Sequence, residues 1–428
     1  MKRLAYLLLL CAACTLPACA LVESIPDPSL AMPKMQAHPD RMVVVTVANP
    51  RQSFALSAGS TGNGYSNTYN TSGSARATLA AIAHQYELTH VMAWPISALG
   101  VHCAVLEIED GRSRKAVLDM LAADPRVQLA EPLQTFEAQS ETSPEKRYTS
   151  LQKTVHEIGA DAAHRVALGD SIRIALIDTG VDTEHPDLRS RIASTRNFVN
   201  SDWAQFNRDE HGTKVAGVIA ADGGGQSSSS ITGIAPRARL VAMKACWQNA
   251  GSGATCNSLR LAQAIQAALD ARADVINLSL GGPADPLLSA LVEQAIKKGV
   301  VVVGAVLPSG DLKAFPVGIP GVIGVATATF ANRAPALQAS TLLYAPGHDI
   351  LTLTPGGHYD FVSGSSFAAA QVTGSVALLL AATPGVDPSA IHGVLERTSG
   401  PNQHYARLIN TCRALAALRS GCNESLAP

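Results

Sequence analysis

The sequence predicts an α/β fold with a mainly parallel sheet over residues 151–420, preceded by a small α+β unit over residues 42–136. In the larger part, short apolar runs alternate with amphipathic helical stretches such as 259–271 and 288–297, which is typical of strands that are buried on both faces. Of the 428 residues, 47% are hydrophobic and 16% are charged, so the chain has enough apolar surface for a large core. The runs expected to form strands are 172–177, 240–242, 275–280, 300–303 and 322–325.

The small unit follows the element order β-α-β-β-α-β, which is the ferredoxin-like split motif. A Gly/Ser/Asn-rich loop, 57–74, separates its first strand from its first helix. An unrelated small domain is the alternative interpretation of this segment. The expected elements are a strand at 42–48, a helix at about 75–86, strands at 88–93 and 102–109, a helix at about 113–123 and a strand at 127–130.

The N-terminal residues 1–24 have the pattern of a secretory signal peptide, with a basic start, a short apolar run and small residues at the exit. Within them, Leu16-Pro17-Ala18-Cys19 resembles a bacterial lipobox with Cys19 as the lipid acceptor. Ordinary cleavage after Ala18-Cys19-Ala20 is the alternative. The Pro-rich residues 25–41 are expected to form a tether.

The overall composition argues against several classes of binding protein. The formal net charge is −1, which gives no electrostatic footprint for nucleic acid or for an anionic membrane surface. The sequence contains neither a His-Glu-x-x-His zinc motif nor an EF-hand-like loop, so no metal site is predicted. A polar linker at 137–150 and a C-terminal tail at 421–428 complete the expected domain plan.

A serine at a predicted helix start marks the first candidate functional stretch, Gly364 to Gly374. Gly364 permits a tight turn, and an apolar helical run follows, so the Ser366 hydroxyl is expected beside the N–H groups and the positive end of a helix dipole. By itself a serine there is usually just a helix cap. Ser366 therefore needs partner residues before it can be assigned a reaction.

Two such partners lie upstream. Asp178 ends the apolar run 172–177, where sheets of this class build their sites, and His211 heads a predicted helix. Taken singly, each residue fits a strand-end turn or a helix cap. Taken together, Asp178, His211 and Ser366 have the chain order of the Asp-His-Ser arrangement of subtilisin.

Four sequence blocks in this order resemble the subtilases, the subtilisin-like serine proteases, over roughly residues 151–400. The resemblance implies a three-layer subtilisin-like fold and a serine endopeptidase that hydrolyses proteins or peptides through an acyl-enzyme. It also implies that Ser279-Leu280-Gly281-Gly282 pairs with the substrate backbone, whereas an edge strand with a glycine turn is the plain alternative. The blocks are 175–182 with 185–188, 211–217 with 233–236, 275–282, and 364–374.

One departure from the family pattern concerns the oxyanion. Where the family has an asparagine whose side chain donates to the oxyanion, this chain has Pro308, which offers no donor. Ser309 is a conceivable substitute if the loop bends. Losing one such donor in subtilisin lowers kcat by about 10²–10³-fold, so the sequence predicts a weakened enzyme rather than a dead one. The other departures are Ser365, Phe367 and Ala370 at variable points of the serine block.

The resemblance further implies that residues 42–136 form a propeptide, whose C-terminal tail lies in the cleft as an intramolecular inhibitor, and that processing occurs within 137–150. The protein is expected to be exported from a bacterial cell. It would then be located in the cell envelope, as an outer-membrane lipoprotein or in the periplasm, or be secreted after processing. A lipid anchor at Cys19 would be the only membrane contact. Many subtilases bind calcium, which is expected here by resemblance only, since no ligand cluster is evident.

The cysteines fit an exported protein. Cys246 and Cys256 flank a polar loop, and Cys412 and Cys422 bracket a short C-terminal segment, so two local disulfides are expected although connectivity does not follow from sequence. Cys103 is left over and is expected to be a buried thiol.

A second hypothesis from another class is a catalytically impaired, lipid-anchored relative that binds peptides and retains residues 40–136 covalently. An aspartic protease is excluded, because the chain has a single Asp-Thr-Gly and that mechanism needs two facing carboxylates.

Overall fold

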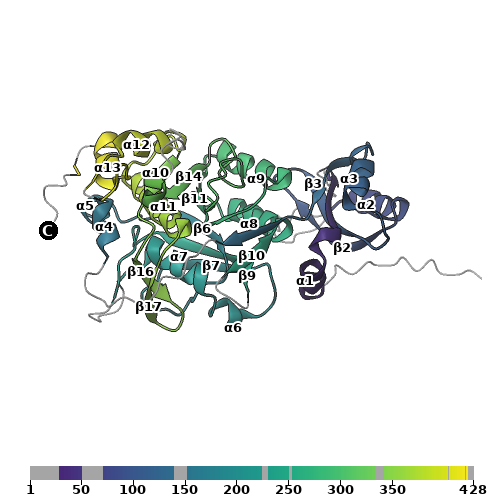
Figure 1. Ribbon diagram of the computed structural model, residues 1–428, viewed down its shortest axis with the longest axis horizontal. Helices are drawn as coiled ribbons and strands as arrows, with labels where there is room; N and C mark the ends of the chain where they lie inside the picture. The colour runs from purple at the N-terminus through teal and green to yellow at the C-terminus, as the bar shows by residue number, and fades with distance from the viewer. Residues whose placement is uncertain are drawn as a thin grey trace, which may run out of the picture.

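The computed structural model describes most of the chain and divides it into two units (Figure 1). The smaller N-terminal unit, drawn in purple and blue, lies against one end of the larger unit, drawn in teal to yellow. The predicted signal peptide, Cys19 and most of the predicted linker and tail lie outside the described residues. Those described are 28–50, 71–138, 152–223, 230–249, 253–333, 342–402, 404–419 and 421–422.

The larger unit is built on a seven-stranded sheet in which every neighbouring pair is parallel, as the apolar runs predict. The strand order is β15-β14-β13-β11-β6-β8-β7, so β6 and β11 lie near the middle. The strands are β6 (Arg173–Asp178), β7 (Ile192–Asn197), β8 (Arg239–Lys244), β11 (Val275–Leu278), β13 (Val301–Ala305), β14 (Ile323–Thr327) and β15 (Leu342–Ala345).

Helices cover both faces of this sheet and complete three layers. Alternate residues of β6 serve the two faces: Ile174 packs with α7 (Glu210–Ala220) and α11 (Ser365–Ala382), whereas Ile177 packs with α8 (Ser258–Asp270) and α9 (Pro286–Lys297). The predicted subtilisin-like α/β architecture is confirmed. Within the described part of the chain, α11 alone is long and apolar enough to cross a membrane, but 83% of it is buried in the protein, as in a core helix.

The smaller unit has an antiparallel sheet in the order β2-β3-β1-β4, the topology of the split motif. Its helices begin where serine side chains accept backbone N–H bonds, Ser72 from Ala75 and Ser113 from Ala116. One sheet face packs on these helices, and the other packs on the layer that contains α8 and α9. The elements are β1 (Met42–Ala48), α2 (Gly73–Gln85), β2 (Leu88–Ile96), β3 (Val101–Ile108), α3 (Arg114–Ala122) and β4 (Val127–Pro132).

Two segments expected to be linkers carry structure of their own. The predicted tether 25–41 contains α1 (Pro28–Ala37) and a 3₁₀ turn (Pro39–Arg41), and Met32 and Met35 of α1 are buried against the larger unit. The predicted linker 137–150 begins inside β5 (Thr135–Ala138), which joins a sheet of the larger unit. Sequence patterns missed both because each gains its order from contacts with a distant part of the chain.

The remaining elements complete the larger unit, and two disulfides brace it. Disulfide bonds join Cys246 to Cys256 and Cys412 to Cys422, and Cys103 is a buried free thiol.

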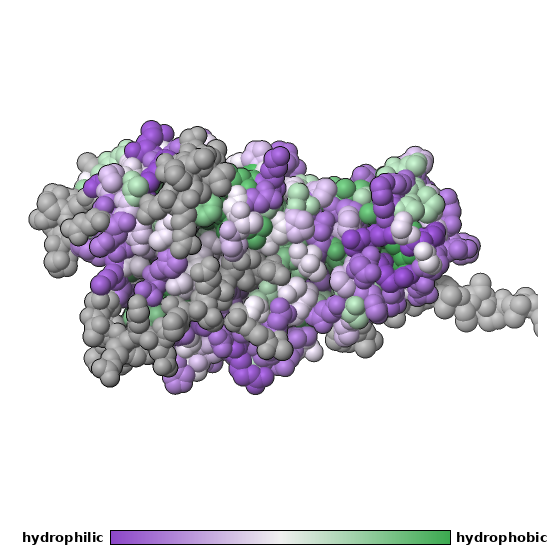
Figure 2. Space-filling view, viewed as in Figure 1, coloured by the Kyte–Doolittle hydropathy of each residue, from purple (hydrophilic) through white to green (hydrophobic). Residues whose placement is uncertain are grey.

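On the face in Figure 2, hydrophilic residues cover most of the described surface, with hydrophobic ones in small separate places. The remaining elements are α4 (Lys153–Glu157), α5 (Ala160–Ala163), α6 (Trp203–Phe206), β9 (Cys246–Gln248), β10 (Ala254–Asn257), β12 (Leu280–Gly281), α10 (Ala328–Arg333), β16 (Ile350–Thr354), β17 (His358–Val362), α12 (Ala390–Thr398) and α13 (Thr411–Leu418).

Candidate active site

The three residues predicted to form a triad come from three elements that meet at the carboxyl end of the sheet. Asp178 is the last residue of β6, and His211 and Ser366 are each the second residue of a helix, α7 and α11. These two helices pack against each other. The first turns of both helices therefore lie beside the end of the central strand.

Asp178 and His211 are in direct contact. The Nδ1 atom of His211 lies 2.8 Å from Oδ1 of Asp178, and both side chains are buried. Because a carboxylate oxygen accepts, Nδ1 carries the proton and Nε2 is left with a lone pair. The N–H of Thr179 also donates to Asp178 Oδ1, at 2.6 Å, and fixes the carboxylate. The imidazole is therefore held in the tautomer that a general base requires.

The helix that carries Ser366 also approaches this imidazole. The Phe367 ring is 5.7 Å from the His211 ring, centroid to centroid, so the first turn of α11, which contains Ser366, lies near the histidine. Gly364 has φ 146°, a conformation that favours glycine, and it turns the chain sharply into α11. The Ser366 hydroxyl donates to the Ser279 carbonyl at 2.9 Å, and the Ser279 hydroxyl donates to the Ser366 carbonyl at 2.9 Å.

The strand predicted to bind substrate, β12, is paired with another segment of the same chain, β5. Strand β12, Leu280–Gly281, pairs antiparallel with β5, in a sheet of order β12-β5-β10-β9. The Phe136 ring packs edge-on against Phe315, and a Cβ atom at Gly282 would lie only 2.2 Å from Phe136 Cδ1. The segment that leaves the smaller unit, β5, thus lies between β12 and β10 of the larger unit. Its last residue, Ala138, lies opposite Leu280, which directly follows Ser279.

Pro308 occupies an exposed turn at the end of β13. The N–H of Gly310 donates to the Leu307 carbonyl, and the Ser309 hydroxyl accepts from the Asp311 N–H at 3.4 Å. The contact of Leu307 was not predicted: a Cβ atom at Gly281 would lie 2.7 Å from Leu307 Cδ2, so the leucine side chain lies against β12. The family pattern alone gave no signal for this contact.

Comparison with known proteins identifies the family. The Subtilase family model matches residues 169–413, which is more than half of the chain and includes all three predicted triad residues. The chain belongs to the subtilase family. This subtilase is 35% identical over 295 residues to the thermophilic serine proteinase of Bacillus sp. (strain AK1), covering 67% of this chain and 70% of that protein.

Other relatives agree. The subtilase is 34% identical over 276 residues to subtilisin E of Bacillus subtilis (strain 168), covering 61% of this chain and 70% of that protein. Its fold matches fervidolysin from Fervidobacterium pennivorans, a keratinolytic enzyme related to subtilisin, with a TM-score of 0.64, 23% identity and coverage of 88% of this chain and 60% of that chain. The protein is therefore a serine-type endopeptidase that acts on protein or peptide substrates.

A buried ion pair adjoins the site of this subtilase and was not predicted. Lys244, at the end of β8, is fully buried and forms an ion pair with Asp209, which is 2% exposed. Burial raises the pKa of the Asp209 carboxyl, and the Lys244 ammonium and the Gly180 N–H oppose that rise. In the sequence, an aspartate just before a predicted helix is usually taken for a cap, which hides this pairing.

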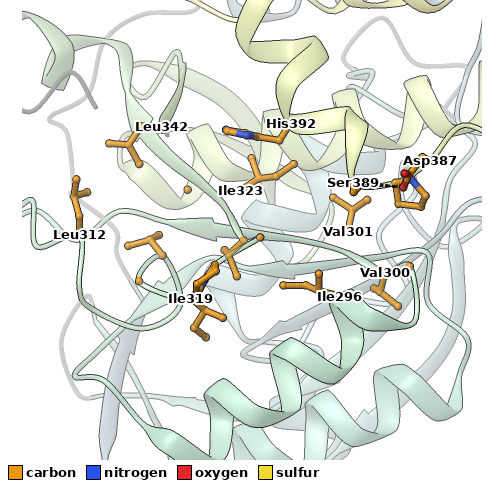
Figure 3. Close-up of a pocket in the computed structure, with 18 residues that line it drawn as sticks. Ile296, Val300, Val301, Leu312, Ile319, Ile323, Leu342, Asp387, Ser389 and His392 are labelled. Carbon is orange, nitrogen blue, oxygen red and sulfur yellow. Dashed lines mark hydrogen bonds between the residues drawn. The ribbon is translucent and has the colours of Figure 1, made fainter. Parts of the chain in front are cut away.

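Neither metal ligands nor the cavity in Figure 3 add to this site. Among the described residues, no group of three or more His, Cys, Asp or Glu side chains could hold a metal ion, and calcium stays an expectation from resemblance. A cavity of about 420 Å³ lies at the amino ends of β13 and β14, beyond the opposite end of the sheet from Ser366. Its walls are largely apolar, with Asp387, Ser389 and His392 along one side (Figure 3).

Proposed function

We propose that this subtilase is an exported endopeptidase in which Ser366 is the nucleophile, His211 the general base and acid, and Asp178 the residue that orients the imidazole. The observation that carries the proposal is the 2.8 Å contact between His211 and Asp178, with the first turn of α11, which contains Ser366, near the same ring. Export is supported by the signal-like N-terminus and by the two disulfides. If Cys19 is lipidated, cleavage in the linker leaves the lipid on the N-terminal part.

The reaction follows from these contacts. The Ser366 oxygen attacks the peptide carbonyl carbon while His211 Nε2 takes the hydroxyl proton. The C–N bond then breaks as the imidazolium returns this proton to the leaving amine. Water attacks the acyl-enzyme with the same imidazole as base, and the acid product leaves. Asp178 stabilises the imidazolium at each stage.

The oxyanion site is proposed to be weak. A backbone N–H at the start of α11 remains as a donor, but Pro308 contributes none from the position where the family has an amide side chain. The Ser309 hydroxyl accepts the Asp311 N–H at 3.4 Å within its own turn, which leaves its O–H hydrogen as a substitute donor of lesser reach than an amide side chain. We therefore expect slow turnover from an otherwise complete site.

The smaller unit is proposed to be a propeptide that inhibits its own enzyme. Its tail β5 occupies the edge of β12, with Glu137 opposite Gly281 and Ala138 opposite Leu280. One further step of this antiparallel register leads to Ser279, whose carbonyl contacts Ser366. We expect self-cleavage after Gln139, inside the predicted linker. Mass analysis of the purified chain tests this: the wild type should be cut there, and the Ser366→Ala chain should stay whole.

Substituting Gly282 by alanine is expected to displace the tail. The added methyl group would overlap the Phe136 ring, which packs at this point, and overpacking of this kind costs about 1–3 kcal/mol. In the Ser366→Ala background, hydrogen exchange of residues 135–138 should become faster. Gly111→Ala is the matched control, because nothing lies within 4 Å of its added methyl group. Equal exchange rates of residues 135–138 in both variants would contradict the proposed position of β5.

The contact between the two units is expected to weaken with rising pH. Glu131 of β4 accepts from the Leu287 N–H at the start of α9, and burial together with the Asp285 carboxylate raises the pKa of Glu131 to about 9. Because this value exceeds that of an exposed glutamate, about 4.3, the folded chain binds the proton more tightly than the unfolded chain. The contribution of this contact is complete below about pH 4 and is lost toward about pH 9, by at most about 1.4 kcal/mol per pH unit.

Urea unfolding of the Ser366→Ala chain across this pH range measures that slope. Glu131→Gln removes the titrating group, and the slope should become shallower. Glu293→Gln, on the exposed side of α9, is the control and should leave the slope as it was. A slope that Glu131→Gln does not change would contradict this account.

A further inference from the structure

Asp209 connects three elements around the site. It precedes α7 in the position of a helix cap, yet its side chain makes no cap hydrogen bond. Its Oδ2 atom instead accepts the Gly180 N–H at 2.8 Å and pairs with the Lys244 ammonium. This close approach depends on Gly180, because a Cβ atom there would lie 2.6 Å from Asp209 Oδ2 and 2.1 Å from the Phe206 carbonyl oxygen.

These contacts fix the segment that carries His211. On one side of the histidine, Asp209 bonds to Gly180. On the other side, the Gly212 N–H donates to Thr179 Oγ1 at 2.9 Å. Thr179 and Gly180 directly follow Asp178, so both bonds tie the first turn of α7 to the turn that presents the Asp178 carboxylate.

Lys244 lies where it could compete with His211 for Asp178. Lys244 and Asp178 end the neighbouring parallel strands β8 and β6 and are register partners, so their side chains leave the sheet on the same face. Asp178 Oδ2 is buried and accepts no hydrogen bond from the part of the chain that the structure describes. A buried ammonium requires a counter-charge, and Asp209 supplies it.

We propose that Asp209 and Lys244 are positioning residues of this endopeptidase. Their ion pair keeps the Lys244 ammonium away from Asp178, which leaves that carboxylate to His211, and it anchors α7 at Gly180. The inference rests on the proposed function of His211 as general base. Within the described part of the chain, hydrogen bonds and an ion pair bring the charges of Asp178, Lys244 and Asp209 to the segment that carries the histidine. Glu210 of α7 is exposed and pairs with Lys214.

The test removes one charge and then both. Asp209→Asn keeps an acceptor for the Gly180 N–H but releases Lys244 toward Asp178. We expect kcat to fall about 10- to 100-fold with KM nearly unchanged, and the acid limb of kcat/KM to move to lower pH because a cation now faces the imidazole. Adding Lys244→Met removes that cation, so the double variant should recover most of the lost kcat and return the acid limb to its original place.

If Asp209 and Lys244 only stabilised the fold, the double variant should have a lower kcat than the single variant, since removing a second buried group would add to the damage. A double variant as slow as the single variant, or a single variant with an unmoved acid limb, would overturn the proposal. If Asp209→Asn does not fold, Lys244→Met alone gives the second arm: the unpaired Asp209 carboxylate should move the acid limb to higher pH. Glu210→Gln is the exposed control and should change neither quantity.

A measurement that needs no turnover separates this inference from the proposed function. In the full-length Ser366→Ala chain, the proton that His211 donates to Asp178 can be followed by low-field proton NMR as the pH is changed. We expect its titration midpoint to fall with Asp209→Asn and to return with the double variant. An inactive wild type would contradict the proposed function and leave this readout intact, whereas an unmoved midpoint would contradict the positioning role.

Discussion

Replacing Ser366 by alanine is expected to lower kcat by about 10⁶-fold, the size of the loss when the serine of subtilisin is removed. The reason is that the proposed nucleophile is this hydroxyl, in the first turn of α11 near a histidine that is held by a buried carboxylate. KM should change little once the smaller unit has been removed from both preparations, because the substitution leaves β12 untouched. The measurement is hydrolysis of a chromogenic peptide by matched preparations of the variant and the wild type.

The variant should remain folded, since Ser366 is one small side chain in the first turn of a long core helix. Ser365→Ala, one position earlier in the same turn, is the control for damage to that turn and should lose far less activity. Similar losses in both variants would mean that the helix start, rather than the hydroxyl, is what the reaction needs.

Replacing Pro308 by asparagine is expected to raise kcat by about 10²–10³-fold. An amide side chain in this turn restores a donor to the developing oxyanion, and one such donor is worth about 3–4 kcal/mol in subtilisin. Since the gain belongs to the transition state, kcat should rise while KM stays nearly constant. Steady-state kinetics on one peptide substrate measures both quantities.

Pro308→Ala is the matched control, because it frees the backbone in the same way but adds no side-chain donor. If both variants accelerate equally, the gain comes from relaxing the turn. If neither accelerates, the turn at Leu307–Gly310 does not face the oxyanion, and the proposed weakness of the oxyanion site is wrong.

Much of the fold and of the site could be predicted from the chain alone. The run 172–177 gave strand β6, because a strand buried on both faces needs apolar residues at every position. Asp178 at its end and His211 at a helix start marked two residues that the fold brings into contact, and the first turn of α11, with Ser366, lies near them. These signals are local, and so a single sequence carries them.

The rest depends on contacts between segments distant in sequence. Nothing in Thr135–Ala138 shows that it will pair with Leu280, because the four residues take their strand conformation from two partner strands. The Lys244 and Asp209 pair was missed for the same reason, since each residue alone is typical of a surface or a helix cap. The contact of Leu307 with Gly281 needed the fold before it had meaning.

The most direct test of the central claim is to treat the wild-type protein with a fluorophosphonate and identify the modified residue by mass spectrometry of its peptides. The account predicts one adduct, on Ser366, that disappears with His211→Ala and weakens strongly with Asp178→Asn. A folded wild-type chain with no adduct would contradict the account and favour a peptide-binding relative without turnover. An adduct on a different serine would place the reaction elsewhere in the molecule.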